Sequence, residues 1–136
     1  MANVTVERDG EVLRITLSRP DRRNAFDSAL VGELAEAFVD VGRARAVVLA
    51  GEGRSFCAGA DVDWMRASVG LSFEENVADA NAMRQMFEAI DRCPTPVVAR
   101  VQGHALAAQP LEHRLPVRRQ QHLIERVVAV RRPLGR

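Results

Sequence analysis

Two short, mostly apolar runs restrict most strongly what this chain can fold into. They span residues 46–50 and 97–101, and each follows a segment whose apolar residues repeat at helical spacing. Continuous apolar runs of this length are typical of strands in a sheet that is covered on both faces. Pro94 and Pro96 separate the second run from the helix before it, because proline cannot continue a helix. The two runs therefore predict an α/β fold in which strands and helices alternate.

The residues before the first run predict a ββα unit. Two β-rich segments, at 3–8 and 11–17, flank Asp9-Gly10, a dipeptide that strongly favours a hairpin turn. A helix should begin at Asp27 or Ser28, whose side chains can accept hydrogen bonds from the first turn, and it should end near residues 41–42.

The residues between the two runs predict further helix. Trp64 and Met65 could start one, and residues 67–71 are expected to form a loop. Ser72 and Glu75 then fit a capping box, so a helix is predicted from residue 73 to about residue 92.

Composition excludes several classes of protein. A length of 136 residues fits one domain. No apolar run approaches the length of a membrane span and no signal peptide is evident, so we expect a cytoplasmic protein with no membrane partner. Cys57 and Cys93 have no metal or redox spacing and are expected to be reduced. The three histidines, at intervals of nine, lack acidic or Cys partners at ligand spacing, so no metal site is expected.

Charge changes abruptly near residue 107. Residues 1–106 hold 12 Arg and 16 acidic residues, whereas residues 107–136 hold 7 Arg and 2 Glu. The Arg residues of this tail are scattered among Leu, Val and Pro without aromatic neighbours, which argues against a nucleic-acid partner. We expect the tail to be poorly ordered or to form a short helix.

Small residues cluster in RSFCAGADVD (54–63), directly after the first apolar run. Ala58, Gly59 and Ala60 would let a backbone approach another group closely and leave its N–H groups free. A tight connection from strand to helix explains the same composition without any function.

Three blocks in register decide between these readings. RPDRRNAFD (19–27), AVVLAGEGRSFCAGADV (46–62) and PTPVVARVQGHAL (94–106) resemble the crotonase family, the enoyl-CoA hydratases and isomerases. The resemblance covers residues 1–106 and implies the N-terminal part of a crotonase-like spiral of ββα units. It also implies an acyl-CoA substrate, no separate cofactor because coenzyme A is part of that substrate, and trimers or hexamers. GADVDWMR and SFEENVADA most resemble hydratases of methylglutaconyl-CoA type.

The resemblance also implies a site. In the family, two backbone N–H groups hold the enolate oxygen of the thioester, and by position these belong to Ala60 and Ala108. The Cβ of Ala108 intrudes where the family has glycine. The implied substrate-binding residues are Ala25, Ala58, Ala60, Asp61, Val62 and Asp63.

The tail lacks the expected catalytic glutamates. Leu111 stands where the first glutamate is expected, and Glu112 is turned about 100 degrees away if the segment is helical. With GC-rich codons, residues 106–109 can be written CTG GCG GCG CAG, and one G inserted after CTG gives Leu-Gly-Gly-Ala. We therefore predict a frameshift at about Leu106. Two functions stay open: an enoyl-CoA hydratase, impaired in this form, or an inert fragment that at most binds acyl-CoA.

Overall fold

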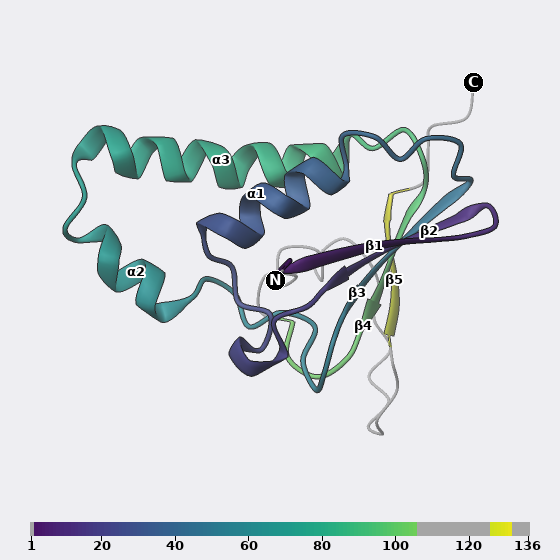
Figure 1. Ribbon diagram of the computed structural model, residues 1–136, viewed down its shortest axis with the longest axis horizontal. Helices are drawn as coiled ribbons and strands as arrows, with labels where there is room; N and C mark the ends of the chain where they lie inside the picture. Colours follow the sequence, from purple (N-terminus) through teal and green to yellow (C-terminus); the bar gives the residue numbers. More distant parts are fainter. Residues whose placement is uncertain (1, 106–125, 132–136) are drawn as a thin grey trace.

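The computed structural model describes residues 2–105 and 126–131, and these form a five-stranded sheet with helices packed on it (Figure 1). The strands follow one another in space as in sequence: β1 (Val4–Asp9), β2 (Val12–Leu17), β3 (Ala46–Gly51), β4 (Val97–Val101) and β5 (Arg126–Arg131). β1 and β2 form an antiparallel hairpin, whereas β2, β3 and β4 run parallel to one another. The predicted α/β alternation is confirmed.

The hairpin and the two apolar runs lie where the sequence predicts them. Asp9 pairs with Val12, so Gly10 and Glu11 form the turn. Alternate residues of the parallel strands point to one face and are buried against the helices, because successive side chains of a strand point to opposite faces. This buried face holds Leu13, Ile15, Leu17, Val47, Leu49, Val97 and Ala99.

Two helices pack together over this face (Figure 1). α1 (Ser28–Ala37) buries Leu30, Val31 and Leu34, as its apolar stripe predicts. It ends at Ala37, earlier than expected, because the Phe38 N–H bonds back to the Ala35 carbonyl (3.2 Å) in a tightened last turn. α3 (Phe73–Asp91) begins with the predicted capping box. Among the described residues, no helix is long and apolar enough to cross a membrane.

Between β3 and α3 lies α2 (Val62–Ser68), so the expected loop at 67–71 is wrong for Ala67 and Ser68. The indole N–H of Trp64 donates to Asp79 Oδ2 of α3 (3.3 Å) and holds the two helices together.

The segment Arg126–Arg131 corrects the expectation of a short helix. It forms β5 and pairs antiparallel with β4 from Val97 to Val101. Three of its six residues are Val, which favours a strand, and the edge of β4 offers backbone groups that need partners. Leu123 and Ile124, which belonged to the same expected helix, lie outside the described residues.

Asp61 caps the N-terminus of α2 and is only 5% exposed. Its Oδ1 accepts hydrogen bonds from the N–H groups of Asp63 (2.9 Å) and Trp64 (3.3 Å). Burial by itself would raise the pKa of this carboxyl. The two hydrogen bonds, with the charges of Arg22 and Arg19, outweigh burial and lower the pKa below its ordinary value of 3.8.

The capping box predicts a local loss of stability. Ser72→Ala removes the Oγ that accepts from the Glu75 N–H (3.1 Å), so the free energy of unfolding should fall by about 1 kcal/mol. Urea unfolding measures this loss. Ser28→Ala, at an exposed serine that begins α1, is the matched control and should change stability by less than about 0.5 kcal/mol. Equal losses in both variants would contradict the assignment.

Asp61 predicts a pH-dependent contribution to stability. Because its pKa is lower in the folded chain than in the unfolded chain, its charge stabilises the fold above pH 3.8, and this stabilisation is lost as the pH falls through the folded pKa. Asp61→Asn should therefore be less stable than wild type by about 1 to 2 kcal/mol near neutral pH, with the gap closing in acid. Urea unfolding across this pH range, with the exposed Asp21→Asn as control, tests it. A gap that does not change with pH would refute the assignment.

Candidate functional site

Three loops meet at one edge of the sheet. Residues 18–27 follow β2, residues 52–61 follow β3 and residues 102–105 follow β4, and all three strands are parallel. Their carboxyl ends therefore lie at the same edge, near the bottom of Figure 1. In open α/β sheets, ligands bind outside the carboxyl ends of the strands. This edge is the candidate site.

Ala60 lies in a short parallel bridge with Phe26. The Phe26 N–H donates to the Gly59 carbonyl (2.8 Å), and the Asp61 N–H donates to the Phe26 carbonyl (2.7 Å). In this pattern the residue between Gly59 and Asp61 turns its own N–H and carbonyl away from the partner strand. The Ala60 N–H makes no hydrogen bond to any described residue. It is thus a backbone donor whose position is fixed by the bridge and whose N–H has no partner among the described residues, which makes Ala60 a candidate ligand contact.

The neighbours of Ala60 are small and are tied to the first loop. The Ala58 N–H donates to the Arg23 carbonyl (3.0 Å), and Ala25, which is buried, precedes Phe26 in the chain. Gly59 has a φ of 91°, a conformation that a residue with a Cβ rarely adopts. The structure therefore brings the expected Ala25, Ala58 and Ala60 together.

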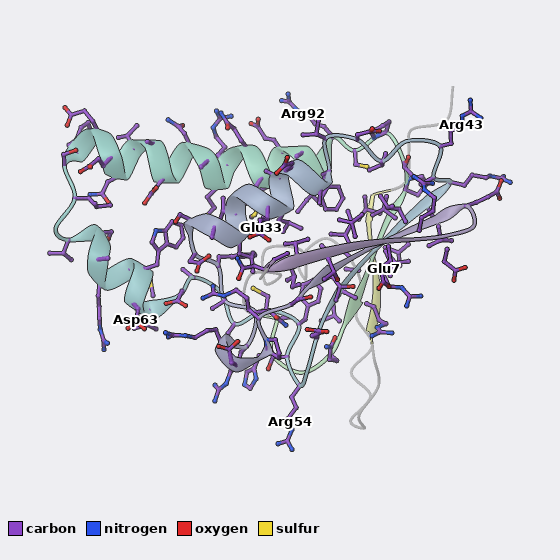
Figure 2. The ribbon with its side chains drawn as sticks, in the orientation of Figure 1. Glu7, Glu33, Arg43, Arg54, Asp63 and Arg92 are labelled. Carbon is purple, nitrogen blue, oxygen red and sulfur yellow. The ribbon has the colours of Figure 1, made fainter. Side chains whose placement is uncertain are left out.

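The remaining expected residues continue from Ala60 into α2. Val62 is 54% exposed and is the first residue of the helix. Asp63 is exposed and pairs with Arg22 (2.7 Å), on the 3-10 turn η1 (Pro20–Arg22), and with Arg66 (3.6 Å). Figure 2 shows Asp63 at the end of α2 that lies nearest η1. The hydrogen bond to Asp63, with the charges of Asp61 and Asp63, raises the pKa of Arg22.

The loop after β4 runs beside this segment. The Phe56 N–H donates to the Gln102 carbonyl (2.8 Å), the Cys57 N–H donates to the His104 carbonyl (3.0 Å), and Cys57 forms a parallel bridge with Ala105. At Ala105 the chain therefore lies beside the segment that leads to Ala60. Ala108, the expected second donor, lies outside the described residues, as do Leu111 and Glu112.

Cys57 and Cys93 are free and both are buried. Burial raises the pKa of the Cys57 thiol, although the Gly59 N–H, 3.4 Å from its Sγ, acts in the opposite direction. Among the described residues, no group of three or more His, Cys, Asp or Glu side chains could hold a metal ion.

Sequence reasoning missed two residues that build the site. Asn24 is fully buried with a φ of 55°, and its side chain accepts from the Arg19 N–H (2.8 Å) and donates to the Glu52 (2.9 Å) and Ser55 (2.8 Å) carbonyls. It thereby joins the first two loops. Arg19 forms ion pairs with two carboxylates. The only signal was their place in the block RPDRRNAFD, where an Asn suits a left-handed backbone position.

Comparison with known proteins shows which family the chain resembles. The family model for enoyl-CoA hydratase/isomerase matches residues 7–109. "Probable enoyl-CoA hydratase echA6" of Mycobacterium tuberculosis is 42% identical over 99 residues, which are 71% of this chain and 37% of that protein. The human mitochondrial Delta(3,5)-Delta(2,4)-dienoyl-CoA isomerase is 34% identical over 103 residues, covering 68% of this chain and 31% of the isomerase.

Solved structures show the same fold. An enoyl-CoA hydratase from Shewanella pealeana superposes with a TM-score of 0.69 at 34% identity, over 74% of this chain and 39% of that one. A hydratase from Mycobacterium smegmatis gives a TM-score of 0.67 at 39% identity, over 74% of this chain and 40% of that one. The chain thus spans less than half the length of these relatives, and it has their α/β crotonase-like fold over that part. This chain belongs to the enoyl-CoA hydratase/isomerase family.

Proposed function

We propose that residues 1–106 are the N-terminal part of an enoyl-CoA hydratase and that the Ala60 N–H binds the thioester oxygen of an acyl-CoA. The observation that supports this proposal is the Ala60 N–H, which no described residue accepts from and which the bridge to Phe26 fixes at the carboxyl edge of the parallel strands. A backbone N–H stays a donor at every working pH, and one such donor is worth about 3 kcal/mol in barrier height.

The reaction explains why such a donor is needed. Water adds across the Cα=Cβ bond of the enoyl thioester: its hydroxyl joins Cβ, a proton joins Cα, and the double bond becomes single. Negative charge gathers on the thioester oxygen as the Cβ–O bond forms, so a fixed donor stabilises the transition state more than the substrate. In the family that the sequence resembles, two glutamates handle the proton of the water.

A second candidate function is an inert chain that binds acyl-CoA without turning it over. It is favoured by Leu111, which stands three residues after Ala108 where the acid/base carboxylate is expected. Loss of a general acid or base costs a factor of about 10² to 10⁴ in rate. Between the two candidates, we propose binding without efficient turnover for this chain.

For the acyl group, we propose a branched, carboxylated chain of methylglutaconyl type. The two segments that resemble such hydratases, GADVDWMR and SFEENVADA, lie on α2 and α3 and are joined by the hydrogen bond from Trp64 to Asp79 (3.3 Å). One pocket formed by both helices would explain why the two segments go together. We further propose a cytoplasmic location and, for the parent enzyme, trimers or hexamers.

The genetic code limits which residues a shifted reading frame of the tail can encode. After one inserted base, each new codon takes the last base of one codon and the first two of the next. Glutamate is encoded by GAA or GAG, so the first two bases of an original codon must be AA or AG. In residues 107–117 only Arg114 can have such a codon. The preceding His113 codon ends in C or T, so the required leading G is missing. In the other shifted frame, each new codon takes the last two bases of one codon and the first base of the next. Glutamate then needs an Arg114 codon that ends in GA, followed by A or G, but the Leu115 codon begins with C or T.

Neither shifted frame can therefore encode a glutamate from 107 to 117. On this proposal the parent protein has glycines at positions 107 and 108 and a residue other than glutamate at position 111. The acid/base work would then fall to a group elsewhere in the parent enzyme.

The gene sequence tests the frameshift directly. Glycine at position 108 of the restored frame requires that the Ala107 codon end in G, so that codon should be GCG. Any other alanine codon at position 107 would refute a single inserted base after Leu106. A new determination of the genomic DNA sequence around codons 106–108 provides the measurement.

The donor role of Ala60 is tested by changing one atom. Replacing Ala60 with lactic acid by nonsense suppression turns its N–H into an ester oxygen. Furylacryloyl-CoA, an enoyl thioester whose absorption moves to longer wavelength when its carbonyl is polarised, is the probe. Wild type should bind it with such a shift, and the ester variant should lose most of the shift.

The matched control is the same ester at Ala29, an exposed alanine in α1 whose N–H makes no hydrogen bond to the described residues. It should behave as wild type. Binding by wild type without a spectral shift would refute the donor role. A hydration assay with crotonyl-CoA and methylglutaconyl-CoA separates the two candidate functions, because clear turnover would refute the hypothesis of an inert chain.

A further inference from the structure

The Arg19 side chain joins three acceptors from both strands of the Ala60 bridge. Its Nη1 lies 2.8 Å from Asp27 Oδ2 and 2.8 Å from the Ala25 carbonyl, and its Nη2 lies 3.5 Å from Asp61 Oδ2. The side chain is only 14% exposed. A guanidinium suits this place because its planar fork can donate to several acceptors at once.

The two carboxylates are the N-caps of two different helices. Asp27 accepts from the Leu30 N–H (2.9 Å) at the start of α1, and Asp61 accepts from the first turn of α2. Phe26 directly precedes the first cap, and Ala60 directly precedes the second. Arg19 therefore fixes the two residues of the bridge from outside, by holding the residue that follows each of them.

The backbone of Arg19 is fixed in turn. Its N–H donates to the buried Asn24 Oδ1 (2.8 Å), and Asn24 donates to carbonyls of the loop after β3. Buried polar networks of this kind hold one geometry when every member is satisfied. Arg19 thus reaches the Ala60 loop through its side chain and, by way of Asn24, through its backbone.

We propose that Arg19 is a positioning residue that sets the direction of the Ala60 N–H. This proposal rests on the proposed donor role of Ala60. It adds that the direction of the Ala60 N–H depends on the Arg19 guanidinium, which does not contact the ligand. A role in stability alone would leave the polarisation of a bound thioester unchanged.

The first experiment compares polarisation with affinity in the full chain. Arg19→Met should lower the spectral shift of saturating furylacryloyl-CoA by at least half, with a change of less than about threefold in Kd. Arg19→Lys, which keeps the charge but not the fork, should restore part of the shift. Arg45→Met removes an exposed ion pair with Glu11 (3.4 Å) at the opposite ends of the strands and should leave both quantities unchanged. A full shift in Arg19→Met would overturn the proposal.

The second experiment needs no ligand. The amides of Phe26 and Asp61 bond across the bridge, so in Arg19→Met their hydrogen exchange should be at least tenfold faster, whereas the amide of Val47 in β3 should keep its wild-type rate. Unchanged exchange at Phe26 and Asp61 would overturn the proposal even if wild type fails to bind acyl-CoA. Failure of wild type to bind, with exchange altered as expected, would instead refute the proposed function and leave Arg19 as the residue that holds the bridge.

Discussion

The candidate site depends on one short parallel bridge, in which Phe26 exchanges hydrogen bonds with Gly59 and Asp61. Two bonds of this kind are weak by themselves, because each replaces a bond to water and contributes only about 1 kcal/mol. The bridge persists because both of its strands are held elsewhere, by the packing of β2 against β3 and by the buried network of Arg19 and Asn24. Its geometry leaves the Ala60 N–H without a partner in the part of the chain that the structure describes.

The polar groups at this edge serve two purposes at once. Asp61 ends one loop and begins α2, and its charge is held by N–H groups of the helix and by Arg19. Burial of such a carboxylate would be costly without these partners. The same contacts that make α2 start at Val62 therefore also fix the residue before Asp61, so folding and the proposed ligand binding depend on the same carboxylate.

Helices and strands could be predicted from the sequence wherever the pattern depends on neighbouring residues. The hairpin turn, the two buried strands and the Ser72 capping box each depend on neighbouring residues, and each is found as predicted. The predictions failed where a distant partner decides the outcome. Ala67 belongs to α2, which is tied to α3 through Trp64 and Asp79, and residues 126–131 pair with β4, whose open edge no local pattern reveals.

The sequence by itself determined the fold class and the family resemblance, since these depend on periodicity and on three blocks in register, and it predicted Ala60 as a backbone donor. The resemblance also predicts a carboxylate at position 111, where the sequence has Leu. Only the tertiary structure decided that the Ala60 N–H has no partner within residues 2–105 and 126–131, because this depends on which neighbour takes each bond of Phe26. It alone also revealed Arg19 and Asn24 as the residues that hold the site, because their partners are brought together by strands that are parallel in space and far apart in the chain.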